Sequence, residues 1–246
     1  MNRVLLVVGF ICFGLAATPV LAEGMSKQQG DEILKELKSI RVLLEKNQNQ
    51  AKQPPQAAEV LKRVKASTTE GVALGSKKAP LVLIEFTDYQ CPYCKRFYDT
   101  TFAELKKNYI DTGKLRFISR NLPLPFHKHA EDAALAAACA NDQGKYWQMR
   151  QSIFANPQQL QPENLSVYAK DNGLSVKRFD MCMEKKTHIK KIQKDMADAR
   201  AIGISGTPSF VLARNSGKIV EGEKVVGAQP FAAFSHHIES LLKQAK

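Results

Sequence analysis

"FTDYQCPYCKRFY", residues 86–98, places two cysteines three positions apart, where one predicted element ends and the next begins. The run "LVLIEFT", residues 81–87, is short and largely apolar, which is typical of a buried central strand. The residues after the cysteines predict a helix that continues to about residue 113. Pro92 fits the first helical position, where the missing N–H group costs nothing. We therefore expect both cysteines in the first turn of a helix that follows a buried strand.

The position of the cysteine pair favours redox chemistry. Free N–H groups and the positive end of the helix dipole stabilise a thiolate on Cys91. Cys94 lies three residues later, on the same helical face and one turn deeper. We therefore expect an accessible, acidic thiol on Cys91 and a shielded thiol on Cys94. Thiol–disulfide exchange requires this asymmetry, because one sulfur meets the substrate and the other resolves the intermediate.

A zinc site and a structural disulfide are the alternatives for this pair. Structural zinc needs four ligands, usually two such cysteine pairs or one pair plus spaced histidines. The chain has no second CxxC motif, and its close histidine pairs are His127 with His129 and His236 with His237. A Cys91–Cys94 disulfide closes so short a loop that it would constrain the unfolded chain little. We expect no metal ion and no other cofactor.

Residues 1–22 have the pattern of a secretory signal peptide. Arg3 supplies a positive start, an apolar run extends from residue 4 to 17, and Val20-Leu21-Ala22 offers the small residues that a signal peptidase reads. The apolar run is shorter than the roughly 20 residues of a membrane-spanning helix, so an uncleaved anchor is the weaker alternative. We expect cleavage after Ala22 and a periplasmic location.

Four cysteines remain after cleavage, namely Cys91, Cys94, Cys139 and Cys182. An even number in an exported protein allows two disulfides, with three possible connectivities. The formal net charge of the whole chain is +12. The lysines are scattered along predicted helices and mixed with acidic residues, so we expect solubility, weak attraction to acidic surfaces or unfolded substrates, and no nucleic-acid partner.

Residues 26–52 predict a helix with an apolar stripe. Ile33, Leu37, Ile40 and Leu44 recur at spacings of four, three and four, as in a coiled coil. Such a helix is not stable alone in water, so its stripe packs on another copy of the chain or on its own domain. "NQNQAKQPPQ" separates this helix from the rest of the chain and favours self-association, with a dimer preferred. We expect an oligomerisation helix over residues 23–54 and a linker over 55–76.

The remaining sequence predicts an α/β sandwich. A short helix is expected over 57–67, within the linker. Beyond the strand at 81–87, further strands are expected at 114–122, 209–214 and 218–227, a helical block at about 125–200, and a last helix at 230–246. This order predicts a sheet with a helical insertion over residues 77–246.

"EFTDYQCPYC" together with "GTPSF", residues 206–210, resembles the DsbA-like branch of the thioredoxin superfamily. "CANDQGKYWQMRQSIF" and "FDMCMEKK" resemble the helical insertion of this branch, so the resemblance covers about residues 77–246. CPYC alone is a weak signal, since glutaredoxins carry it too. The resemblance implies a thioredoxin-like fold. It also implies a thiol:disulfide oxidoreductase that forms and isomerises disulfides in exported proteins through Cys91 and Cys94.

The resemblance also assigns roles to individual residues. Pro208 matches the cis-proline that faces the cysteines, and a cis peptide after Thr207 would leave the Thr207 backbone free to pair with an extended substrate. Pro92 and Tyr93 are expected to contact the same substrate. Tyr93 cannot carry the positive charge that a histidine there could. We therefore expect a less oxidising site than that of an enzyme with a CPHC motif.

Glu85 matches the buried carboxylate that this branch places under the cysteines. Burial of an isolated carboxylate disfavours its charged form, so Glu85 is expected to exchange a proton with Cys94. Asp88 is expected only to shape the loop before the helix, and His127 only to start a helix or to pack.

The resemblance further implies a structural disulfide between Cys139 and Cys182. Its 43-residue loop would contribute about 4 kcal/mol on the chain-entropy estimate. Two free buried thiols are the alternative.

Thiolate stabilisation sets how oxidising such a site is. A thiol pKa lowered from about 8.5 to about 5 stabilises the reduced form by roughly 5 kcal/mol, which raises the reduction potential by roughly 100 mV. With its extra helix the chain resembles the dimeric DsbA-like proteins, which implies a membrane redox partner of the DsbB or DsbD type. A periplasmic reductase, and a chaperone or copper-handling protein whose thiols bind Cu(I), are the competing functions.

Overall fold

The computed structural model describes residues 27–52 and 62–244, and in the first of these ranges it describes side chains only as far as residue 42. The predicted signal peptide, residues 1–22, lies outside the described residues. The chain divides into two units, residues 1–59 and 60–246.

Helix α1 (Lys27–Lys52) forms where the apolar stripe predicts it. Ile33, Leu37 and Ile40 are 48%, 54% and 49% exposed. Leu44 lies beyond the described side chains. None of the described helices combines the length and the apolar composition that crossing a membrane requires.

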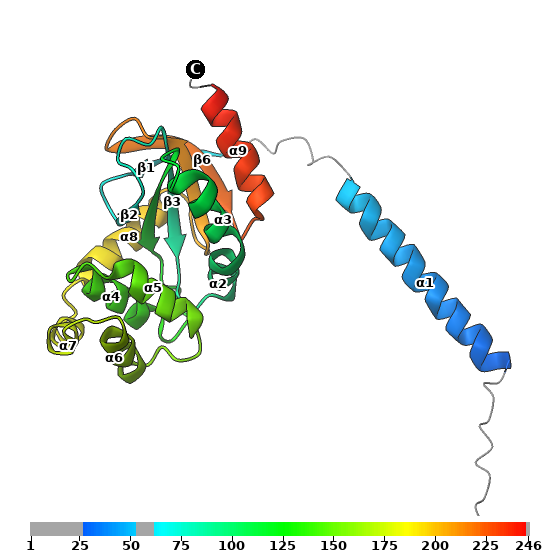
Figure 1. Ribbon diagram of the computed structural model, residues 1–246, viewed down its shortest axis with the longest axis horizontal. Coiled ribbons are helices and arrows are strands. Elements are labelled where there is room, and N and C mark those ends of the chain that lie inside the picture. Colours follow the sequence, from blue (N-terminus) through cyan, green and yellow to red (C-terminus); the bar gives the residue numbers. More distant parts are fainter. Residues whose placement is uncertain (1–26, 53–61, 245–246) are drawn as a thin grey trace, which may run out of the picture. The chain divides into compact units, whose positions relative to one another are not determined.

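Six strands form one mixed sheet in the second unit (Figure 1). They are β1 (Arg63–Ser67), β2 (Val72–Leu74), β3 (Leu81–Thr87), β4 (Leu115–Asn121), β5 (Ser209–Arg214) and β6 (Ile219–Val226), in the order β1-β6-β5-β3-β4-β2. Strand β3 pairs in parallel with β4 and antiparallel with β5, and all seven of its residues are buried. The predicted central strand is therefore confirmed, as are the three strands expected after it.

The short helix predicted over residues 57–67 is wrong in its described part, and so is the linker over 63–76. Residues 63–67 form edge strand β1, which pairs antiparallel with β6, and β2 pairs antiparallel with β4. In β1 the side chains alternate, since Val64 and Ala66 are buried whereas Arg63 and Lys65 are exposed. This two-residue period is that of a strand, but five residues are too few to separate it from a helix by pattern alone.

Helices cover both faces of the sheet. On one face, α2 (Pro92–Phe97) continues without a break through η1 (Tyr98–Phe102), α3 (Ala103–Leu105) and η2 (Lys106–Ile110), and α9 (Phe231–Lys243) packs beside it. Phe97 lies at the centre, with its ring 4.6 Å from Phe210 of β5 and 5.7 Å from Phe234 of α9. The segments η1 and η2 are π-helical, so the predicted single helix forms with two wider turns. Helix α8 (Ile189–Ala201) packs on the other face, against β4.

The predicted insertion consists of α4 (Ala130–Asn141), α5 (Tyr146–Ala155), α6 (Pro162–Asp171), α7 (Val176–Glu184) and α8 (Ile189–Ala201). Within this helical block, α7 and α8 are separated near Lys186, whose φ of 47° cannot continue a right-handed helix. Most buried apolar side chains of the insertion form one cluster with Cys91 and Cys94. The insertion therefore supplies the apolar surroundings of the cysteine pair.

A disulfide joins Cys139 of α4 to Cys182 of α7, across 43 residues of sequence. The pairing that the resemblance implies is therefore present in the structure, and the alternative of two free thiols is not.

Replacing this disulfide is expected to weaken the insertion. The double variant Cys139→Ser/Cys182→Ser should lose about 4 kcal/mol of unfolding free energy in urea, because the closed loop no longer restricts the unfolded chain. In a Cys91→Ala/Cys94→Ala background, in which the other two cysteines cannot respond, dithiothreitol should produce a similar loss in the protein that retains the Cys139–Cys182 disulfide and none in the variant that lacks it. Equal stability of the two proteins under oxidising conditions would contradict this role.

Candidate active site at the cysteine pair

The two cysteines occupy the first turn of α2. Cys91 is the residue before the helix, with φ of −71° and ψ of 123°, and Pro92 is the first helical residue. Cys91 is 4% exposed and Cys94 is fully buried, and both are free thiols. Both cysteines thus lie at the first turn of a helix that follows a buried strand, as the sequence predicts.

The two thiols have opposite electrostatic surroundings. The hydrogen bond from Cys94 is the largest influence on Cys91. Together with Thr207 and the backbone N–H groups at the helix start, it outweighs burial and lowers the pKa of Cys91 to about 5. Burial is the largest influence on Cys94 and raises its pKa well above the ordinary value, and the neighbouring Cys91 adds to that rise. One sulfur is therefore set to ionise while the other keeps its proton.

The expectation of a freely accessible Cys91 thiol is wrong. Only 4% of the residue is exposed, and its Sγ donates a hydrogen bond to the carbonyl oxygen of Thr207 at 3.4 Å. This contact joins residues 116 positions apart in the chain. The loop around Thr207, rather than open solvent, is thus the immediate neighbour of the reactive sulfur.

The Thr207–Pro208 peptide bond is cis, as the resemblance implies. The loop is held in place by two hydrogen bonds: the Ser209 hydroxyl donates to the Gly206 carbonyl, and the Gly227 N–H donates to the Pro208 carbonyl. The Thr207 hydroxyl oxygen is buried and has no hydrogen-bond partner among the described residues. Two oxygens of Thr207 therefore lie beside the cysteine pair. The carbonyl oxygen accepts a hydrogen bond from Cys91, and the hydroxyl oxygen has no partner among the described residues.

Apolar and basic side chains lie at the outer end of the first helical turn. Pro92 and Tyr93 are exposed, the latter by 56%. The guanidinium carbon of Arg96 lies over the Tyr93 ring, 5.1 Å from its centre. Tyr93 itself carries no charge, but this stacking brings a positive charge onto the same turn.

Asp88 has a larger role than the sequence suggested. Its carboxylate is buried and accepts hydrogen bonds from the N–H groups of Gln90, Cys91 and Leu124, at 2.8, 3.2 and 2.8 Å. It also lies 2.8 Å from Nδ1 of His127. Asp88 therefore fixes the backbone of Cys91 and ties it to the loop before α4. An aspartate side chain commonly accepts a hydrogen bond from the N–H two residues later in a turn. This turn signal would have identified the contact with Gln90, but not the contacts with Leu124 and His127.

Glu85 is fully buried in β3, but it is not isolated. Its carboxylate lies 2.9 Å from Nη2 of Arg150 on α5 and accepts a hydrogen bond from the Ser119 hydroxyl of β4 at 3.1 Å. The expectation of an unpaired carboxylate is therefore wrong, because a cation from the insertion neutralises it. Exchange of a proton between Glu85 and Cys94 stays a prediction.

Arg150, which sequence reasoning missed, is itself fully buried. Six aromatic rings surround its guanidinium at 4.9 to 5.9 Å, from Tyr89, Tyr98, Phe102, Phe117, Trp147 and Phe154. Cation–π contacts and the Glu85 pair together offset the removal of this charge from water. The rings come from β4, α5, the η1 turn and the loop before the cysteines, so no local pattern indicates this site.

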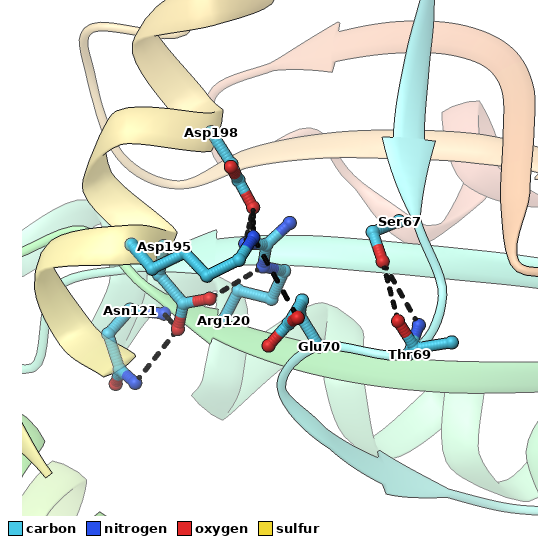
Figure 2. Close-up of polar contacts among 8 residues, drawn as sticks. Ser67, Thr69, Glu70, Arg120, Asn121, Asp195 and Asp198 are labelled. Carbon is cyan, nitrogen blue, oxygen red and sulfur yellow. Dashed lines mark hydrogen bonds and ion pairs between the residues drawn. The ribbon is translucent and has the colours of Figure 1, made fainter. Parts of the chain in front are cut away.

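A second buried ion network holds α8 on the sheet (Figure 2). Nε of Arg120 on β4 donates to Asp195 at 2.7 Å, and Nη2 of the same side chain donates to Asp198. Asp195 also accepts from the backbone and the side chain of Asn121. Because residues 202–208 come directly after α8, this network anchors the helix that leads into the cis-proline loop.

One group in the described part of the chain combines side chains that can bind a metal. Cys139, Cys182 and His188 place ligand atoms within 4.8 Å of one another. The two sulfurs are bonded to each other, so the remaining ligand of this group is His188, whose Nε2 lies 2.7 Å from a carboxylate oxygen of Asp142.

Known proteins share the sequence pattern of this chain. Residues 67–240 match the sequence model of the thioredoxin family. The chain is 29% identical over 173 residues to a Na⁺/H⁺ antiporter NhaA of Salinispora tropica, covering 70% of this chain and 25% of that protein. It is 32% identical over 154 residues to the NhaA of Herminiimonas arsenicoxydans, covering 63% and 23%. The chain thus spans about a quarter of the length of these relatives.

Solved structures of known proteins match most of this chain. Alpha-DsbA1 of Wolbachia pipientis is 28% identical with a TM-score of 0.62, covering 70% of this chain and 91% of that one. Oxidised BdbD of Bacillus subtilis is 26% identical with a TM-score of 0.64, covering 74% and 98%. The catalytic domain of Proteus mirabilis ScsC is 25% identical with a TM-score of 0.54, covering 70% and 88%.

Removing one partner of the Glu85–Arg150 pair is expected to be costly. Arg150→Met should lower the free energy of unfolding by about 3–5 kcal/mol, because Glu85 is then buried without a cation. The double variant Glu85→Leu/Arg150→Met should recover most of this loss. Arg63→Met, which breaks an ion pair whose side chains are more than half exposed, serves as the control with little effect. Urea unfolding measures all three, and an Arg150→Met protein as stable as the parent would refute the pairing.

Proposed function

Because this chain belongs to the thioredoxin family and to its DsbA-like branch, we propose that it is a thiol:disulfide oxidoreductase that forms and isomerises disulfides in exported proteins. One observation carries the proposal: two free thiols share one helical turn, and their surroundings shift their pKa values in opposite directions. A structural or metal-binding pair has no need of this asymmetry.

In the forward reaction the enzyme begins with a Cys91–Cys94 disulfide. A client thiolate attacks Sγ of Cys91, the bond between the two cysteines breaks, and its electron pair passes to Cys94. A second client thiolate then attacks the client sulfur bound to Cys91. The client disulfide forms, Cys91 leaves as a thiolate, and the two electrons remain on the enzyme. The low pKa of Cys91 makes it a good leaving group, so donating the disulfide is favoured.

The other site residues have proposed supporting roles. Thr207 and Pro208 would pair with an extended client segment, and the contact between the Thr207 carbonyl and the Cys91 sulfur supports this role. Pro92 and Tyr93, both exposed, contact the same segment. Glu85 would exchange a proton with Cys94. Its carboxylate oxygens already accept hydrogen bonds from Arg150 and Ser119, so this relay requires the pair to open.

The compartment and the recycling partner are inferred from the same chemistry. The Cys139–Cys182 disulfide and the signal-peptide pattern of residues 1–22 both support export to the oxidising periplasm. Each client oxidation leaves a dithiol at Cys91 and Cys94, which must pass its electrons on. A membrane redox protein of the DsbB or DsbD type would accept or exchange them.

Helix α1 supports a self-associating enzyme. Ile33, Leu37 and Ile40 are exposed along one stripe of the helix, which another copy of the stripe would cover. A dimer that holds two redox sites around one client favours reshuffling of wrong disulfides over simple oxidation.

The ionisation of Cys91 is expected near pH 5. Thiolate absorbance of the reduced protein should rise with a midpoint at about 5. Cys91→Ala should remove this transition. The folded-state pKa lies below the unfolded value of about 8.5, so the thiolate stabilises the reduced fold fully above pH 8.5 and ceases to do so as the pH falls through about 5. A midpoint at the unfolded value would count against a disulfide-donating role.

Loss of the α1 stripe is expected to dissociate the protein. Deletion of residues 23–54 should give a monomer that oxidises reduced peptides but isomerises scrambled ribonuclease poorly. The full-length variant Ile33→Ser/Leu37→Ser/Ile40→Ser should behave alike, whereas Lys35→Ser/Lys38→Ser on the same helix should not. Sedimentation measures the mass, and an unchanged mass in the triple variant would show that α1 is not the interface.

A further inference from the structure

The hydroxyl of Thr87 is a buried polar group without a partner. Thr87 is the last residue of β3, only 1% exposed, and its Oγ1 makes no hydrogen bond to any described group. Its carbonyl is used, because the Leu122 N–H donates to it at 2.8 Å. A buried hydroxyl that is left unpaired costs free energy. This residue therefore carries a donor that the reduced protein does not use.

The unused donor lies beside the sulfur of Cys94. The N–H of Asp88, the residue next to Thr87, donates to Sγ of Cys94 at 3.5 Å, so the Thr87–Asp88 peptide lies against that sulfur. Burial is the largest influence on Cys94 and raises its pKa, whereas the Asp88 N–H and the Thr87 side chain both lower it. The hydroxyl is thus within reach of a charge on Cys94, although it makes no hydrogen bond to the neutral thiol.

We propose that Thr87 is a catalytic residue, whose hydroxyl donates a hydrogen bond to the Cys94 thiolate while the Cys91–Cys94 bond opens or closes. This inference rests on the proposed oxidoreductase function and names a further participant in it. The proposal gives the unpaired Thr87 hydroxyl a hydrogen-bond acceptor, namely Sγ of Cys94, the reacting atom beside it.

The exchange step explains why the donor is needed. When a client thiolate bonds to Cys91, the bond to Cys94 breaks and Cys94 receives the electron pair. In the reverse step the Cys94 thiolate attacks Cys91, and the client sulfur leaves with the electrons and takes a proton. Both directions pass through one transition state with negative charge on a fully buried sulfur. A donor that is unpaired before the charge develops and paired afterwards stabilises that state selectively.

Three variants test the proposal. Thr87→Val removes the hydroxyl at nearly constant volume, and Thr87→Ser keeps it. Thr101→Val removes a buried hydroxyl that donates to the Gln229 carbonyl and has no contact with the cysteines. The readout is the rate at which a Cys91–glutathione mixed disulfide is resolved by Cys94. Thr87→Val should slow it by about tenfold, the expected effect of one hydrogen bond to a charged group. Thr87→Ser and Thr101→Val should keep the parent rate.

Stability separates this role from a structural one. Thr87→Val deletes an unpaired hydroxyl and should unfold in urea no earlier than the parent, while Thr101→Val deletes a paired one and should unfold earlier. Slow resolution in a fully stable Thr87→Val protein would support the proposal. Resolution at the parent rate in Thr87→Val, or equal slowing in Thr87→Ser, would overturn it.

Titration of the Cys94 thiol tests the role of Thr87 independently of enzyme activity. In a Cys91→Ala background, Cys94 is the remaining free thiol of the described chain, and its thiolate absorbance reports its pKa. Adding Thr87→Val should raise that pKa by about one unit, which corresponds to the tenfold rate effect. An unchanged pKa refutes the role of Thr87 even if exchange is normal. A parent protein that exchanges no disulfide with glutathione refutes the proposed function, and the titration still decides on Thr87.

Discussion

The hydrogen bond between the sulfurs of Cys91 and Cys94 is the interaction on which the site depends. It is the largest influence that lowers the pKa of Cys91, and it requires Cys94 to keep its proton. Both conditions arise from the placement of the pair across one helical turn, with one sulfur at the mouth of the helix and the other fully buried. The same geometry therefore lowers the pKa of Cys91 and raises the pKa of Cys94.

The surrounding scaffold keeps that geometry rigid through buried charges rather than through packing alone. Asp88 holds the Cys91 backbone, the Glu85–Arg150 pair joins β3 to the insertion, and the Arg120 network joins β4 to the helix that leads to the cis-proline loop. Buried ion pairs contribute little net stability compared with apolar residues of the same size, but each is strongly destabilising when half of it is removed. They therefore fix the relative positions of elements that carry the site.

The same site combines groups that are fully paired with groups that are not. The carboxylates of Glu85 and Asp88 near the cysteines have partners, whereas the hydroxyls of Thr87 and Thr207 have none among the described residues. Both hydroxyl-bearing side chains contribute to lowering the pKa of a neighbouring cysteine. Unpaired donors beside sulfur atoms are suited to a reaction in which negative charge moves from one sulfur to the other.

Local pattern in the sequence determined the central strand, the helix that starts at the cysteines and the N-terminal apolar stripe, because periodicity and turn chemistry act over a few residues. The resemblance of "GTPSF" and "FDMCMEKK" to a known branch supplied the cis-proline and the Cys139–Cys182 pair. Only the tertiary structure decided that the Thr207 carbonyl contacts the Cys91 sulfur, that Arg150 neutralises Glu85 and that residues 63–67 form an edge strand. Each of these contacts joins residues 65 to 160 positions apart, a separation across which no sequence period carries information.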